Sequence, residues 1–182
     1  MKAYILLAEG FETVEALGPA DVFKRAGVEY KLVSISSDQN VTSSHGVRVQ
    51  ADCCLGDGSQ VEDGDVLVLP GGYPGYVNLR SNEEVCRLAW NYYESGRLLA
   101  AICGAPTLLQ QEGLAVGARI TCHHSVKDDM KNFVYTGKIV ERDGNLITAI
   151  GAGRSFDFAL AIVEALLGNG AVDKIKGGLE LR

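Results

Sequence analysis

The features that direct a protein to a membrane or to nucleic acid are missing from this sequence of 182 residues. The apolar segment near the N-terminus, residues 4–8, is too short for a signal peptide or a membrane span. Lys and Arg total 17 against 23 Asp and Glu, which gives a net charge of −6, and the basic residues are dispersed along the chain. Nucleic acid and membranes are therefore not expected partners, because both need clustered positive charge or long apolar segments. We expect a cytoplasmic protein.

The cysteines lack the arrangement of a disulfide framework or a zinc site. Their number is odd, and no two have CxxC spacing. The five are Cys53, Cys54, Cys86, Cys103 and Cys122. We expect five reduced thiols, with no metal and no cofactor.

Proline is scarce, with 4 residues, and the 22 glycines lie mostly between segments of periodic hydrophobicity. This composition, 47% hydrophobic, is typical of one globular α/β domain over residues 1–182. Strands are predicted at 3–8, 29–36, 65–69, 98–102 and 119–122, and helices at 11–26, 83–95, 105–112 and 155–167. Hairpins are predicted over 41–54, turning at 43–46, and over 139–149, turning at 143–145. Alternating strands and helices predict a mostly parallel sheet with helices on both faces, a three-layer α/β/α sandwich.

Cys103 lies where the buried strand 98–102 gives way to the helix 105–112, which has Pro106 in its first turn. A thiol at such a strand-to-helix turn meets the N–H groups and the positive end of the helix dipole, which stabilise a thiolate. This position predicts a nucleophile or redox centre at a nucleophile elbow. The alternative is a buried cysteine that acts as a small hydrophobic residue.

Other polar and glycine residues also follow predicted strands. Residues 9–12, Gly71, Gly72 and His123 come just past strand ends, and in parallel sheets such ends share one ligand-binding edge. Glu15 lies in the first helix, where Pro19 removes the hydrogen bond to its carbonyl and predicts a kink or an opened turn. A buried, protonated Glu15 would donate a hydrogen bond to a Cys103 thiolate. The alternative is a solvated carboxylate that complements the helix dipole.

Several spaced motifs resemble one superfamily. They are LPGG at 69–72, AICGAPT at 101–107 and SFDFALAIVEAL at 155–166, and the likeness runs from residue 3 to about 181. In these segments the chain resembles the ThiJ/PfpI superfamily, in its Parkinsonism-associated deglycase branch. The resemblance implies a flavodoxin-like fold and a homodimer.

The resemblance also implies roles for particular residues. Cys103 matches the elbow cysteine, Glu15 the helix glutamate beside it, and His123 the nearby histidine. Gly72 and Gly104 match the positions whose N–H groups form an oxyanion pocket. The arginines that the partner subunit brings to the site correspond to Arg25 and Arg48.

The chain departs from the superfamily pattern in two places. The protease and chaperone branches have histidine directly after the elbow cysteine, whereas this chain has Gly104, which disfavours a cysteine protease. His124 stands where the nearest branch tends to have proline, so His123 and His124 are both open as the histidine that faces the site. For these two, and for His45, a surface imidazole is the alternative interpretation.

Two functions fit these residues. The first is an enzyme in which Cys103 attacks a small α-oxoaldehyde such as methylglyoxal, or its glycated adduct on amines or thiols, and yields a hydroxy acid such as lactate. The second is a non-enzymatic redox sensor or chaperone in which Cys103 is oxidised. No thiazole-binding or phosphate-binding signature supports a role in thiamine metabolism.

Overall fold

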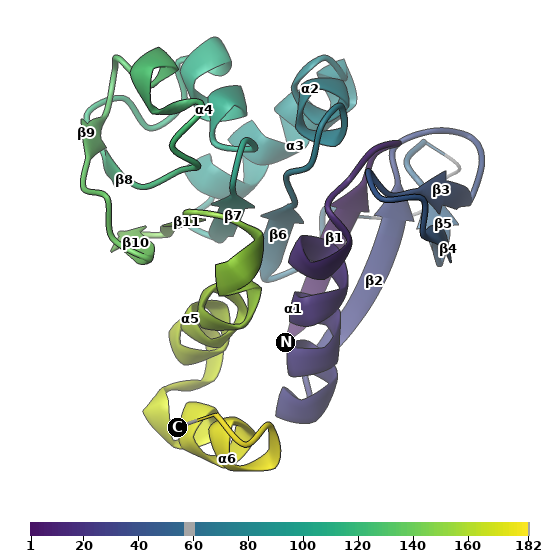
Figure 1. The fold of residues 1–182 in the computed structure, drawn as a ribbon, viewed down its shortest axis with the longest axis vertical. Helices are drawn as coiled ribbons and strands as arrows, with labels where there is room; N and C mark the ends of the chain where they lie inside the picture. Colours follow the sequence, from purple (N-terminus) through teal and green to yellow (C-terminus); the bar gives the residue numbers. More distant parts are fainter. Residues whose placement is uncertain (57–60, 182) are drawn as a thin grey trace.

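A seven-stranded, mostly parallel sheet forms the centre of the computed structural model, which describes residues 1–56 and 61–181 (Figure 1). The strand order is β10-β11-β7-β6-β1-β2-β5, and every neighbouring pair is parallel except β10 and β11. The strands are β1 (Lys2–Leu7), β2 (Glu29–Ser34), β5 (Cys53–Cys54), β6 (Val66–Leu69), β7 (Leu98–Ile102), β10 (Val140–Asp143) and β11 (Leu146–Ala149). This confirms the predicted α/β class.

Four short strands form two further pairs. β3 (Asn40–Thr42) and β4 (Arg48–Gln50) make an antiparallel hairpin, while β8 (Arg119–Ile120) and β9 (Val134–Tyr135) pair in parallel. The predicted hairpin at 41–54 therefore exists, but β3 and β4 stand apart from the main sheet. The edge position beside β2 belongs to β5.

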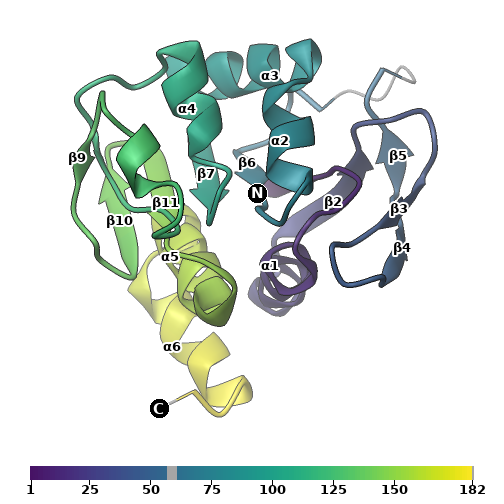
Figure 2. The same ribbon diagram turned by 45° about the horizontal axis from the view of Figure 1, so that its top comes forward.

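The helices cover both faces of the sheet (Figure 2). One layer contains α1 (Thr13–Ala26), α5 (Ser155–Leu167) and α6 (Asn169–Gly178), and the other contains α2 (Gly75–Arg80), α3 (Glu83–Glu94) and α4 (Thr107–Glu112). Two single 3-10 turns, η1 (Lys127–Asp129) and η2 (Ala152–Arg154), lie in loops. Within the described residues, 1–56 and 61–181, no helix combines the length and apolar character needed to cross a bilayer.

Side chains of the central strands alternate between the two helical layers. Those that face α1, α5 and α6 include Ile5, Val68, Ala100 and Ile147. Those that face α2, α3 and α4 include Leu6, Leu67, Leu99 and Leu146. Because both faces are covered, these strands are apolar at every position, which is why continuous hydrophobic runs predicted them.

Helix α1 begins two residues later than expected and passes through Pro19 as one continuous element. Its end agrees with the prediction, because Gly27 adopts a left-handed φ of 73° and caps the last turn. The opened turn expected at Pro19 is therefore not observed, although Pro19 has no N–H to donate to the carbonyl of Glu15.

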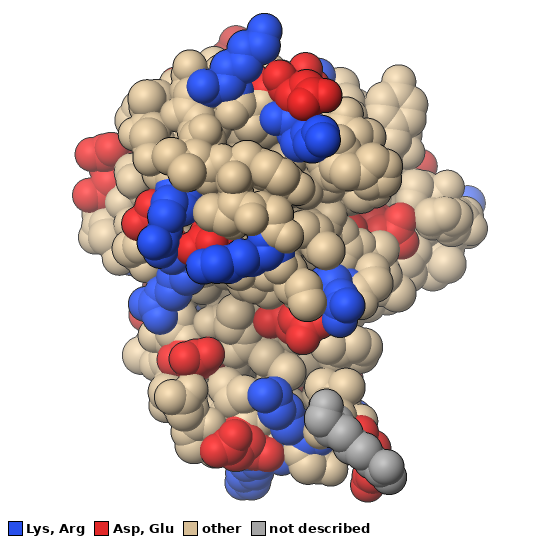
Figure 3. Space-filling view, turned by 60° about the vertical axis from the view of Figure 1, so that its left-hand side comes forward, with Lys and Arg blue, Asp and Glu red and all other residues tan. Residues whose placement is uncertain are grey.

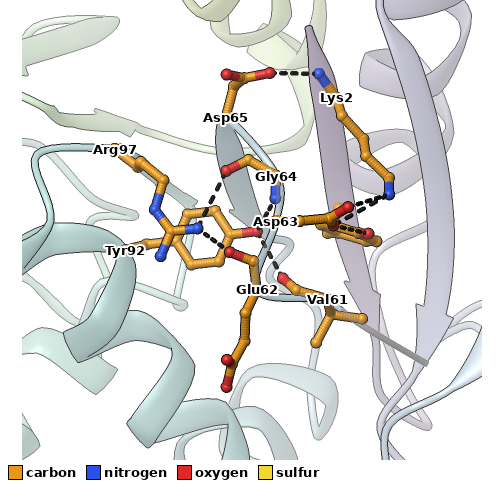
Figure 4. Close-up of polar contacts among 9 residues, drawn as sticks. Lys2, Val61, Glu62, Asp63, Gly64, Asp65, Tyr92 and Arg97 are labelled. Atoms are coloured by element: carbon orange, nitrogen blue, oxygen red, sulfur yellow. Dashed lines mark hydrogen bonds and ion pairs between the residues drawn. The ribbon is translucent and has the colours of Figure 1, made fainter. Parts of the chain in front are cut away.

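The loop before β6 is fixed by Tyr92 of α3 (Figure 4). The Tyr92 hydroxyl donates to the Val61 carbonyl at 2.6 Å and accepts from the Gly64 N–H at 3.2 Å. The Arg97 guanidinium lies 4.1 Å from the Tyr92 ring centroid and donates to the Glu62 carbonyl. These bonds fix the amino end of β6, at the sheet edge opposite the carboxyl ends of the parallel strands.

One face of the molecule is shown with its charges in Figure 3. Lys and Arg side chains lie among Asp and Glu on this face and form no uninterrupted basic stripe. Buried Glu141, for example, pairs with Arg119 at 3.2 Å and with Lys138 at 3.0 Å. A phosphate backbone would meet carboxylates here as well as cations.

Candidate active site

Cys103 lies in a sharp turn directly after β7. Its φ of 65° is left-handed, which is uncommon for a residue with a side chain. The Cys103 N–H donates to the Ala149 carbonyl at 3.0 Å, and the Cys103 carbonyl accepts from the His123 N–H at 2.9 Å. The end of β11 and the loop of His123 therefore hold the predicted elbow. The next helix, α4, has six residues and begins at Thr107, two residues later than expected.

Gly71 brings Cys103 and Glu15 together. A Cβ on Gly71 would lie 2.6 Å from the Cβ of Cys103 and 2.7 Å from Oε2 of Glu15, so only glycine fits between them. The Gly71 N–H donates to Oε2 of Glu15 at 2.8 Å. In the sequence, Gly71 is distinguished only by its position just after a predicted strand, and that position assigned it no role. The paired glycines of LPGG were the available signal.

Glu15 is fully buried, and burial is the main reason that its pKa rises from 4.5 to about 7. The Gly71 N–H acts in the opposite direction, because it stabilises the carboxylate. Within the described chain, Oε1 of Glu15 has no hydrogen-bond partner. With a pKa of about 7, Glu15 is divided between its protonated and ionised forms at neutral pH.

The Cys103 thiol has a raised pKa, because burial and then the Glu15 carboxylate disfavour the thiolate. The N–H groups of Gly72 and Gly104 lower the pKa by hydrogen bonding to the sulfur. Burial therefore outweighs the N–H groups that were expected to stabilise a thiolate, and the net shift in the pKa is upward. Helix α4 is short, and three residues separate its start from Cys103, whereas a dipole acts mainly within the first turn. Cys103 and Glu15 therefore share one negative charge and titrate as a pair.

His123 presents a ring edge to the same site. A Cβ on Gly151 would lie 3.4 Å from Cδ2 of His123 and 3.9 Å from both Sγ of Cys103 and Oε1 of Glu15. Nδ1 of His123 accepts from the Ser125 N–H at 3.3 Å, so the neutral ring carries its proton on Nε2. Burial, followed by His124, lowers the pKa of His123 and favours this neutral form.

The other two histidines are both exposed. The exposed His124 ring is 4.2 Å, centroid to centroid, from that of His123. His45 is exposed and lies 3.4 Å from Oε2 of Glu12. Between the two histidines left open by the sequence, the geometry favours His123.

Arg25 and Arg48 are not brought to the site by the chain itself. Arg25 pairs with Asp21 at 2.8 Å and lies ten residues beyond Glu15, which is about 15 Å along α1. Arg48 lies on β4 and is exposed. In residues 1–56 and 61–181, no hydrogen bond or ion pair links either arginine to Cys103, Glu15 or His123. Their contribution to a partner subunit stays a prediction.

Tyr76 of α2 lies against the residue that follows the elbow cysteine. A Cβ on Gly104 would lie 2.6 Å from Cδ1 of the Tyr76 ring. A histidine side chain at this position would therefore displace the ring, which accounts for glycine at position 104. Tyr76 was not predicted as a site residue, because no spacing in the sequence links it to Cys103.

A cleft of about 530 Å³ lies on the side of Gly151 and His123, two residues close to the thiol. Its lining includes Cys122, His123, His124, Tyr135, Gly151 and Arg154. No group of three His, Cys, Asp or Glu side chains in the described part of the chain has the arrangement of a metal site.

Comparison of the chain with known proteins shows the family to which it belongs. The profile of the DJ-1/PfpI family matches residues 1–165. The chain belongs to the DJ-1/PfpI family. Its curated relatives include the Parkinson disease protein 7 homolog of Danio rerio, which is 36% identical over 100% of this chain and 97% of its own. The glutathione-independent glyoxalase DJR-1.2 of Caenorhabditis elegans is 37% identical over 91% of this chain and 89% of its own.

Solved DJ-1/PfpI structures agree with the fold. Drosophila melanogaster DJ-1beta has a TM-score of 0.94 at 36% identity and covers 100% of this chain and 98% of its own. Toxoplasma gondii DJ-1 in an oxidised state has a TM-score of 0.88 at 28% identity, covering 98% of this chain and 97% of its own. The resemblance of the motifs and the flavodoxin-like α/β fold are thereby confirmed.

Proposed function

We propose that this DJ-1/PfpI protein is a cysteine-dependent enzyme that converts small α-oxoaldehydes such as methylglyoxal, or their adducts on amines or thiols, to hydroxy acids such as lactate. The observation that carries the proposal is the pairing of Cys103 with buried Glu15 under the N–H groups of Gly72 and Gly104. The name of the C. elegans relative, a glutathione-independent glyoxalase, supports the same reaction class.

The first step is attack by the Cys103 thiolate on the aldehyde carbon of methylglyoxal. A carbon–sulfur bond forms, and the carbonyl electron pair moves to oxygen. The Gly72 and Gly104 N–H groups, which already meet the sulfur, are close enough to donate to this oxygen. Protonated Glu15, or Nε2–H of His123, supplies the proton that completes a hemithioacetal.

The second step moves hydrogen within the bound substrate. A base removes the proton from the former aldehyde carbon, and a proton returns to the neighbouring carbonyl carbon, which yields a thioester of lactate. Ionised Glu15, whose pKa of about 7 suits proton transfer in both directions, is the assigned base. Water then hydrolyses the thioester and releases lactate and the thiol. Methylglyoxal plus water equals lactic acid, so no external oxidant or reductant is consumed.

Lactate formation from methylglyoxal, without glutathione, tests this proposal. We expect activity in the wild type and in Cys122→Ser, a control that changes another buried thiol, and none above background in Cys103→Ser. Glu15→Gln keeps the shape but not the base, and should lower kcat by about 10²-fold or more. Equal lactate formation by wild type and Cys103→Ser would contradict the proposal.

A second function is favoured by one observation, the unpartnered Oε1 of Glu15 beside the thiol. A protonated Oε1 would donate to a Cys103 sulfinate, formed when two peroxide molecules each transfer one oxygen and leave as water. This is the redox sensor or chaperone alternative. A gain of two oxygens at Cys103 under mild peroxide, with no lactate from methylglyoxal, would support it over the enzyme.

A further inference from the structure

The cleft near Cys103 is lined by basic residues and, within the described chain, by no acidic ones, and the proposed reaction of a neutral aldehyde does not need such a lining. Methylglyoxal is small and uncharged, whereas the cleft has a volume of about 530 Å³. Its lining residues include Arg154, His123, His124 and Tyr135, which carry cationic or hydrogen-bonding side chains. Among the described lining residues none is Asp or Glu, although the chain has a net charge of −6.

Arg154 is only loosely engaged by other protein groups. Its Nη1 lies 3.6 Å from Oδ2 of Asp157, and both side chains are about half exposed. An exposed ion pair at this distance contributes little, so a ligand anion can replace Asp157 at the guanidinium. A guanidinium also binds carboxylate and phosphate through paired N–H donors.

The cleft and the thiol share two residues. Gly151 lines the cleft, and a Cβ built on it would lie 3.9 Å from Sγ of Cys103. His123 likewise lines the cleft and turns its ring edge toward the same point, 3.4 Å from Cδ2. A ligand held in the cleft would therefore lie next to the two residues that flank Cys103.

We propose that this cleft is an anion-binding subsite, in which Arg154, assisted by His124 and Tyr135, holds the carboxylate or phosphate group of a substrate whose aldehyde carbon reacts at Cys103. The substrate class is then an anionic adduct or derivative of an α-oxoaldehyde rather than the free neutral aldehyde. This inference deepens the proposed function and rests on it for the reaction, while the binding of the anion stands separately.

Alkylation of Cys103 by two matched reagents tests the subsite without requiring turnover. Iodoacetate and iodoacetamide both form a carbon–sulfur bond with loss of iodide. They differ in that iodoacetate carries a carboxylate, whereas iodoacetamide carries a neutral amide. The ratio of their rates at Cys103 is divided by the ratio for free N-acetylcysteine in the same buffer. We expect a preference for iodoacetate of about tenfold, which equals about 1.4 kcal/mol, the lower end for hydrogen bonds to charged groups.

Two arginine variants decide whether the subsite causes this preference. Arg154→Gln should remove it, while Arg142→Gln should keep it, because Arg142 is exposed on β10 and its Nε donates to the Gly144 carbonyl outside the cleft. Both variants change the net charge equally. Absence of the preference in the wild type, or equal loss in the two variants, would overturn the proposal.

Competitors and substrates complete the test. Inorganic phosphate and acetate, added separately at equal ionic strength, distinguish a phosphate subsite from a carboxylate subsite by which of them slows iodoacetate labelling. Lactate formation is then compared between methylglyoxal adducts of N-acetylcysteine and of its neutral amide, and Arg154→Gln should erase the advantage of the carboxylate. A preference for iodoacetate without lactate formation would support the subsite and refute the proposed reaction. Lactate formation without a preference for iodoacetate would support the reaction and refute the subsite.

Discussion

Glu15 and Cys103 lie so close that the charge of one controls the charge of the other. Burial penalises two negative charges in the same place, and the glycine N–H groups can stabilise one of them. In the form that the proposed reaction needs, Glu15 keeps the proton and donates it toward a Cys103 thiolate. The alternative form, with an ionised Glu15 and a neutral thiol, is unreactive toward carbonyl carbon.

Replacing Glu15 by leucine or by glutamine separates these forms. Glu15→Leu removes the carboxylate that disfavours the thiolate, so the pKa of Cys103 should fall below that of the wild type. Glu15→Gln retains an N–H donor without a charge, and its Cys103 pKa should be lower than in Glu15→Leu. Thiolate absorbance, with Cys103→Ser as baseline, measures both as properties of the pair. A rise in the pKa on Glu15→Leu would contradict this repulsion and show that Glu15 acts chiefly as a hydrogen-bond donor to the thiolate.

The raised pKa of Glu15 also makes stability depend on pH. A rise from 4.5 to about 7 is worth about 3 kcal/mol, at about 1.4 kcal/mol for each pH unit. The folded state holds the proton more tightly than the unfolded state, so this contribution is complete below pH 4.5 and is lost as the pH rises through 7. The free energy of unfolding, wild type minus Glu15→Gln, should fall by about 2–3 kcal/mol between pH 5 and pH 8. A difference that is flat with pH would contradict a buried, protonated Glu15.

Among the elements, α2 determines what the residue after Cys103 can be. Gly104→Ala should lower both stability and the labelling rate of Cys103, because its Cβ would lie 2.6 Å from the Tyr76 ring. The double variant Gly104→Ala with Tyr76→Ala should recover most of the loss, a coupling of about 1 kcal/mol or more in a double-mutant cycle. Denaturant unfolding of the four proteins provides the measurement, and simple additivity would exclude the steric explanation.

The sequence predicted the elements that have strong periodicity. Helix α5 was predicted with the observed bounds, 155–167, and the strands β1, β6 and β7 agree within one or two residues, because both-face burial gives an unbroken apolar run. Helix α2 was missed since it is short and begins at a glycine of the loop. Helix α6 was missed because three glycines weaken its helical pattern and only Val172 and Ile175 are buried.

The candidate site was partly predictable for a similar reason. Cys103, Gly72, Gly104 and His123 lie at strand ends or turns, which the sequence marks. Gly71 and Tyr76 make their contacts across the fold, and no local pattern reveals such contacts. The direction in which the pKa of Cys103 shifts also depends on how deeply the thiol is buried, and the sequence does not show that burial.

At the scale of the whole molecule, the predicted homodimer would complete the site. Val14, beside Glu15 on α1, has 47% of its surface exposed, and within the described residues no hydrogen bond or ion pair links Arg25 or Arg48 to the site of the same chain. We expect a dimer through residues 14–25 at micromolar concentration, and Val14→Asp should shift it to folded monomers. Light scattering measures the mass, and circular dichroism verifies the fold. A monomeric wild type would refute the dimer and the partner roles of both arginines.

The left-handed backbone of Cys103 has a consequence for how the protein responds to selection. A side chain at φ 65° costs about 1 kcal/mol relative to glycine, so Cys103→Gly should stabilise the fold while it removes the sulfur. Directed evolution for heat resistance alone would then enrich loss of the thiol.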